Sequence, residues 1–271
     1  MVFEQLIKSR WLESKPRFAF LLGFFYSMLG ILSAKLIFPS SAGIMAVAFT
    51  AILLIPSLNQ LLAIEEVQEV RERKFSPIQL FKDHYDILEI YIFVFFGMFT
   101  TFLFFSFFFP DSTTLSFFSP QLKVAGISGA ATAAAVPVKS AFFWSILKNN
   151  LIVLLVSFGL SLIYGAGSIL FLAWNASVWG VIFGFISRQS IQANNLFYGF
   201  TNILFPSFPH MFTEGLSYFL AAIVGGILSK AIIREKLFSK KFNHVLVDAL
   251  LVLCIAVVVV AIAAYIEVSL I

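Results

Sequence analysis

The sequence predicts an all-α integral membrane protein, a polytopic helical bundle of about seven transmembrane helices. Of its 271 residues, 60% are hydrophobic and only 12% are charged, which is too little to cover a soluble surface. The mean hydropathy is +0.97. Apolar runs of about 20 residues recur, which is the length that a helix needs to cross hydrocarbon. Because no polar stretch approaches domain size, we expect one transmembrane domain over residues 1–271.

Each apolar run is assigned to one span that crosses a core of about 30 Å. The predicted spans cover residues 18–38, 42–64, 88–109, 142–164, 167–187, 210–230 and 248–267. Pro39, Ser40 and Ser41 link the first two spans, and a Gly-Ala-Gly segment at residues 165–167 links the fourth and fifth. Such short links predict that each of these pairs forms an antiparallel hairpin.

The basic residues predict the orientation, because cytoplasmic loops are enriched in Lys and Arg. Most of the 18 lie in the N-terminal segment and in the loops at 65–87 and 230–247, and the rest are Lys35, Lys123, Lys139, Lys148 and Arg188. The N-terminus and the 65–87 loop are therefore expected in the cytoplasm, and the 110–140 loop and the C-terminus outside. The net charge of +4 reflects this topology and contact with the lipid bilayer, so no nucleic acid is expected as a partner.

Two polar segments have distinct character. In the 65–87 loop, three glutamates precede Arg71 and Arg73 at helical spacing, which predicts that the second helix continues beyond the membrane. We expect this stem to present a solvated face, with a partner-docking face as the alternative. The 110–140 segment is rich in Ser and small apolar residues, which favours a surface loop or a shallow helix on the outer face over re-entry into the membrane.

Polar residues within the later spans are the strongest functional clue, because they are costly in hydrocarbon. These residues are Asn149, Asn150, Asn175, His210 and Glu214. One interpretation is that they hydrogen-bond to each other across helices, with a modest gain of about 0.6 kcal/mol per bond. The other is that they line an outward-facing cavity that binds a ligand, an ion or a partner segment. The first is favoured because the residues lie near the span ends.

Small residues recur every four positions on two spans. The fifth span carries Ala176, Gly180 and Gly184, and the sixth carries Ala221, Gly225 and Ser229. Such stripes allow close approach of helix backbones. We expect them to stabilise the internal fold rather than a dimer, and a homo-oligomer is left open.

Catalytic alternatives fail on spacing. His210 and Glu214 share a helical face, but a catalytic zinc has three protein ligands, and His84 and His244 are predicted on the opposite side of the membrane. Glu65 and Glu66 resemble the paired glutamates of membrane-embedded prenyl-protein proteases, yet the histidine motifs of those enzymes are missing. A rhomboid-type Ser/His pair and a glycine-rich phosphate loop are also lacking. The sequence therefore predicts a non-enzymatic protein without metal or cofactor.

Two stretches resemble the stage II sporulation protein M family. They are KNNLIVLLVSFGLSLIYGAGSILFLAWNASVWG and PHMFTEGLSYFLAAIVGGILSKAI, with a weaker match in FLLGFFYSMLGILSA, so the resemblance is strongest over residues 143–232. The shared pattern is an Asn-Asn pair, a Gly-rich hairpin, an Asn in the next span, and Pro-His with a Glu four residues after the His. This chain departs from the pattern at Ala176 and Met211, where the family usually has Gly.

The resemblance implies a non-enzymatic multi-pass protein of the cell membrane, and the named member resembles a scaffold that works with cell-wall hydrolases during engulfment in spore formers. We therefore expect a scaffold or assembly component of a membrane or envelope complex, with membrane or envelope proteins as partners. The alternative is a transporter or permease whose polar site is formed by the fourth to sixth spans.

Overall fold

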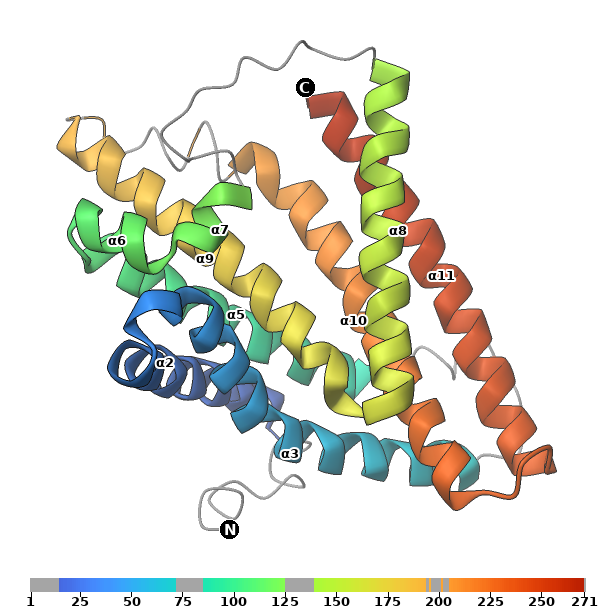
Figure 1. Ribbon diagram of the computed structural model, residues 1–271. Helices are drawn as coiled ribbons and strands as arrows, with labels where there is room; N and C mark the ends of the chain where they lie inside the picture. Colours follow the sequence, from blue (N-terminus) through green and yellow to red (C-terminus); the bar gives the residue numbers. More distant parts are fainter. Residues whose placement is uncertain are drawn as a thin grey trace.

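The long apolar runs form helices because lipid offers the backbone no hydrogen-bond partner. A computed structural model describes residues 15–71, 85–124, 139–193, 195, 201 and 205–270. Within these residues, seven helices are long and apolar enough to cross a membrane, and no strand occurs (Figure 1). The predicted class, an all-α polytopic bundle, is confirmed.

The long helices follow the chain order of the expected spans. They are α2 (Ala19–Ile37), α3 (Ala42–Arg71), α5 (Tyr85–Phe108), α8 (Lys139–Tyr164), α9 (Ile169–Gln192), α10 (Phe205–Arg234) and α11 (Lys240–Leu270). Short 3₁₀ turns are η2 (Pro16–Phe18), η3 (Pro39–Ser41) and η4 (Ala166–Ser168), and two short helices are α6 (Asp111–Phe117) and α7 (Ser119–Val124). The turns η3 and η4 occupy the two links that were predicted to form hairpins. Helices α2 and α3 pack along each other, but the predicted hairpin of α8 and α9 is wrong, because these two helices do not pack along each other.

The long helices pack in two groups, and α10 contacts both of them. Helices α2, α3, α5 and α9 pack together, and α8 packs with α10 and α11, while α10 also contacts α3 and α5. Figure 1 shows α8 and α9 meeting at their lower ends, at η4, and diverging toward the top of the view. Helices α8 and α9, although neighbours in the sequence, therefore pack against different helices.

Helix contacts are closest at glycines. A Cβ on Gly180 or Gly184 would lie 2.5 Å from a carbonyl oxygen of α5, and a Cβ on Gly225 would lie 2.6 Å from the Phe158 oxygen of α8. Ala176 and Ala221 are fully buried. The small-residue stripes of α9 and α10 thus face α5 and α8 inside the molecule.

The segment after α5 is folded rather than extended. Phe118, Leu122 and Gln121 of this segment are almost completely buried, and the Gln121 side-chain amide donates a hydrogen bond to the Gly43 carbonyl at 2.9 Å. Helix α7 packs against α3 and α9. The small-residue part of the expected outer loop, at 125–138, lies outside the described residues, as do 1–14 and the middle of the 65–87 loop.

Helix α3 continues through Arg71, but the start of its charged stem is not a solvated face. Glu65 is 6% exposed and Glu66 is 1% exposed. The Glu66 carboxylate accepts a hydrogen bond from Arg234 of α10 at 2.8 Å. Local spacing pointed to partners on the same helix, whereas the observed partner comes from a distant span.

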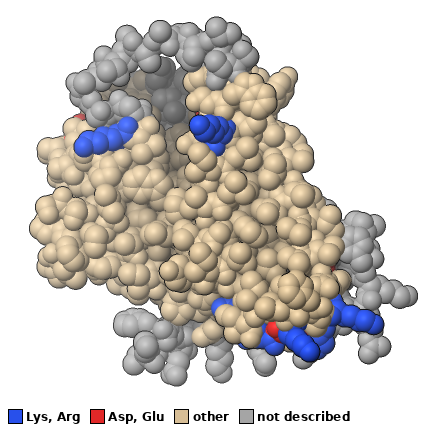
Figure 2. All heavy atoms as spheres, turned by 45° about the vertical axis from the view of Figure 1, so that its right-hand side comes forward, with Lys and Arg blue, Asp and Glu red and all other residues tan. Residues whose placement is uncertain are grey.

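Basic side chains gather at one end of the molecule, over the turn between α10 and α11 (Figure 2). We call Arg234, Lys236, Lys240 and Lys241, which are all exposed, the basic patch. Figure 2 also shows that the surface is hollowed at the opposite end.

Candidate functional site

The predicted polar residues lie on three helices. Asn149 and Asn150 are on α8, and His210 and Glu214 are on α10, which packs along α8. Asn175 is on α9, which packs mainly against α5 and α3. The structure therefore brings four of the five onto neighbouring helices, in the part of the bundle away from the basic patch, and leaves Asn175 apart.

The hydrogen bonds of these residues stay within single helices. Asn175 donates to the Phe171 carbonyl at 2.9 Å, and the Asn149 amide donates to the Asn150 side-chain oxygen at 3.3 Å. The Tyr218 hydroxyl donates to the Glu214 carboxylate at 2.8 Å. Within the described part of the chain, no recorded hydrogen bond joins two of the five predicted residues across helices.

Two polar atoms of the set are buried without a hydrogen bond to any described residue. They are Nδ2 of Asn150 and Nδ1 of His210. Asn150 as a whole is only 4% exposed. A buried polar atom left unpaired costs about 1–3 kcal/mol. Of the five predicted residues, these two therefore have the most to gain from a further hydrogen-bond partner.

Glu267 of α11 belongs to the same region and was not predicted. It lies within electrostatic range of the Glu214 carboxylate. The available signal was an acidic residue at the C-terminal end of the predicted last span, which has Asp248 at its other end. Two carboxylates that share a membrane bundle interact unfavourably when both are ionised, so the pair favours binding of a proton or a cation.

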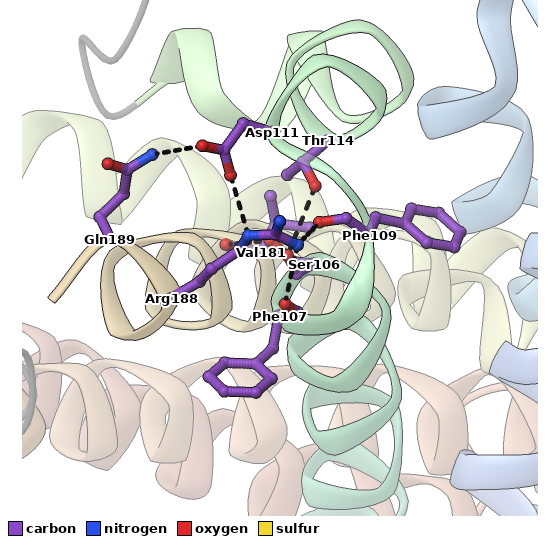
Figure 3. Close-up of polar contacts among 8 residues, drawn as sticks. All are labelled: Ser106, Phe107, Phe109, Asp111, Thr114, Val181, Arg188 and Gln189. Atoms are coloured by element: carbon purple, nitrogen blue, oxygen red, sulfur yellow. Dashed lines mark hydrogen bonds and ion pairs between the residues drawn. The ribbon is translucent and has the colours of Figure 1, made fainter. Parts of the chain in front are cut away.

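A second polar cluster, centred on Arg188, was also missed (Figure 3). The Arg188 guanidinium donates to the carbonyls of Phe107, at 3.3 Å, and Phe109, and it pairs with Asp111 at 3.0 Å. Gln189 donates to the other carboxylate oxygen of Asp111 at 3.1 Å. One arginine of α9 thus satisfies carbonyls at the end of α5 and holds the first residue of α6. We therefore interpret this cluster as one that holds α5, α6 and α9 together rather than as a binding site.

A third cluster joins α3, α10 and the α8–α9 turn near the basic patch. The Asn59 side-chain oxygen accepts hydrogen bonds from Lys230, at 2.9 Å, and from the Ala166 backbone N–H, at 3.0 Å. Arg234 donates to the Ala63 carbonyl at 2.9 Å as well as to Glu66. The sequence signal was a lone Asn in the second span, which carries no information about its partners.

Metal binding finds no support among the described residues, where no group of three or more His, Cys, Asp or Glu side chains could hold an ion. His244 pairs with Asp248 of its own helix at 3.4 Å, and His84 lies outside the described residues.

Comparison with known proteins identifies one family. The family model described as Stage II sporulation protein M matches residues 88–270, which include most of α5 and all the long helices after it. Comparisons with curated proteins and with solved structures give no match.

Proposed function

The chain belongs to the stage II sporulation protein M family, and from that premise we propose that it is a non-enzymatic scaffold or assembly component of a membrane or envelope complex. It is a multi-pass membrane protein, and we infer that it resides in the cell membrane. Its partners would be other membrane or envelope proteins.

The proposal is carried by the state of the intramembrane polar residues. Asn175 and Glu214 are hydrogen-bonded within their own helices. The unpaired atoms of Asn150 and His210 lie on two neighbouring helices. Both atoms are buried in the isolated chain, so a polar group of a partner would reach them only where α8 and α10 move apart. Such a bond would remove their desolvation cost, which favours association over catalysis. The partner would then dock beside α8 and α10, away from the basic patch.

Purification of the tagged chain from its own host tests the scaffold function. We expect a stoichiometric membrane or envelope protein to co-purify, and its yield to fall for Asn150→Leu and for His210→Leu. Asn243→Leu is the matched control, because Asn243 is exposed near the basic patch. Equal recovery of the partner with all three variants would contradict docking beside α8 and α10.

The stem of α3 is the other surface through which a scaffold could act. Replacing residues 72–84, which follow the stem, by a Gly/Ser linker of equal length changes no residue of a described helix. Loss of the partner from this variant alone would assign docking to residues 72–84. A chain that co-purifies with no stoichiometric protein in any form would overturn the scaffold proposal.

A transporter or permease is the second candidate, favoured by the proximity of Glu214 and Glu267. Proton flux into proteoliposomes that contain a pH-sensitive dye tests it. A flux that Glu214→Gln and Glu267→Gln abolish, while both variants stay folded, would support transport and contradict a pure scaffold. Absence of proton flux in the unchanged protein would contradict a proton pathway at Glu214 and Glu267.

A further inference from the structure

A pocket of about 140 Å³ lies between α5, α9 and α10. Aromatic side chains of all three helices line it, together with Met211 and Gly215, and no polar surface faces it. A Cβ on Gly215 would meet only Trp179, at 3.7 Å, and Phe219, at 3.9 Å. Gly215 is therefore not a close-packing glycine, and the missing side chain leaves space that belongs to the pocket.

Ring contacts fix the walls. Phe95 makes edge contacts with Trp179, at a centroid distance of 5.4 Å, and with Phe219, at 5.3 Å. Phe99 contacts Phe183 in the same way at 6.1 Å. Such edge-to-face contacts hold each ring in a preferred orientation. The walls of the pocket are therefore formed by contacts within the protein itself.

The rim of the pocket is exposed within the membrane-spanning part of the chain. Phe208 and Phe212 are 46% and 41% exposed, and their rings stack at 5.9 Å. All lining residues fall inside the candidate spans Tyr85–Phe108, Ala166–Gln192 and Phe205–Arg234. Exposed apolar side chains of a membrane-spanning segment face lipid.

The volume and the apolar lining of the pocket limit the kind of molecule that can bind in it. Water needs polar partners, which this lining does not offer. A transmembrane helix, about 10 Å across, is far too wide. An apolar cavity of about 150 Å³ holds a six-carbon ring, so a pocket of this size fits the end of one hydrocarbon chain.

We propose that this pocket binds an acyl chain of a membrane phospholipid. The chain inserts past Phe208 and Phe212 and ends against Gly215 and Trp179. Met211, which is buried, also lines the pocket. The inference does not depend on the scaffold proposal, because it concerns a different face of α10 from the one that carries His210 and Glu214.

Trp179 is a reporter inside the pocket. The test uses the full chain with Trp11, Trp144 and Trp174 changed to Phe, reconstituted in vesicles of phosphatidylcholine with brominated acyl chains, which quench tryptophan fluorescence on contact. We expect strong quenching of Trp179. Gly215→Leu should remove most of it, because the leucine fills the space. The control is Gly159→Leu, since Gly159 has no neighbour within 4 Å, and it should leave quenching unchanged.

Met211→Ala is a second variant, for the case that Gly215→Leu fails to fold. The smaller side chain widens the pocket, so we expect stronger quenching of Trp179. Quenching that neither variant changes would overturn the proposal. Quenching that falls as the protein-to-lipid ratio rises would also overturn it, because it would assign the pocket to a second copy of the chain.

Discussion

At the scale of single residues, the glycines fall into two kinds. A Cβ on Gly97 would overlap the Phe20 carbonyl of α2, whereas a Cβ on Gly159 of α8 would meet nothing within 4 Å. The first position lets two helix backbones touch, as small residues do in membrane bundles. The second points away from every described neighbour. Residue type alone does not separate the two.

Gly97→Ala should therefore destabilise the protein, and Gly159→Ala should not. The added methyl group at 97 must push α2 and α5 apart, at a cost of about 1–3 kcal/mol, as in other overpacked sites. Unfolding in detergent micelles, followed by circular dichroism, would measure the difference. Equal stabilities of the two variants would show that α2 and α5 are not in such close contact.

The charge of Arg188 joins α9 to the end of α5 and to the start of α6. Arg188→Met should lower the free energy of unfolding by about 1–3 kcal/mol, because the α5 carbonyls and Asp111 lose a charged donor. Arg188→Lys should restore little, since an ammonium group cannot reach three acceptors with the fixed fork of a guanidinium. A double-mutant cycle with Asp111→Asn would measure the ion pair separately. Full rescue by lysine would contradict this geometry.

At the scale of elements, the turn η4 is held by side chains of other helices. Gly165, just before it, has a φ of +67°, a conformation that glycine adopts without strain. Asn59 accepts the Ala166 N–H and also binds Lys230, so one side chain of α3 joins the turn to α10. The α8–α9 turn is thus part of the packed bundle.

Asn59→Leu should loosen this turn. The leucine has a similar size but no acceptor, so the Ala166 N–H and the Lys230 ammonium each lose a bond of about 1–3 kcal/mol. Hydrogen exchange at the turn should rise more than in α5. Adding Lys230→Met should recover part of the stability, because it removes the unpaired charge. An unchanged exchange rate in Asn59→Leu would argue against this role.

At the scale of the whole molecule, the basic patch and the hollowed surface lie at opposite ends. From the positive-inside rule we expect the basic end to lie in the cytoplasm. The native Cys254 is the only cysteine of the chain, so replacing it by Ala provides a background for single-cysteine labelling.

Arg71→Cys and Lys236→Cys should react with a membrane-impermeant thiol reagent from the cytoplasmic side only, and Lys123→Cys from the opposite side only. Labelling of intact cells and of inverted vesicles would distinguish the two sides. Reaction of positions 71 and 236 from different sides would contradict the span order. A uniform reversal of all three would preserve the fold and reverse the orientation.

The all-α class could be predicted because hydropathy acts along the chain: each span carries its own apolar run. Which residues contact each other across helices could not be predicted. Glu66 binds Arg234, 168 positions away, while local spacing favoured Arg71 and Arg73. Asn175 was grouped with His210 because both are polar and intramembrane, but α9 packs on α5 instead. A shallow helix was one of the two expectations for the segment that contains α6 and α7, but no local pattern reveals that this segment is buried against other helices.

The divergence of α8 and α9 bears on how the chain is assembled during synthesis. When α9 emerges, its neighbours α3 and α5 are already in the membrane. Helix α8 is made earlier, yet its long contacts are with α10 and α11, which are made last. It must therefore wait in lipid, with Asn150 uncovered, until the final hairpin is inserted. Completion of the C-terminal helices is the event that closes the bundle.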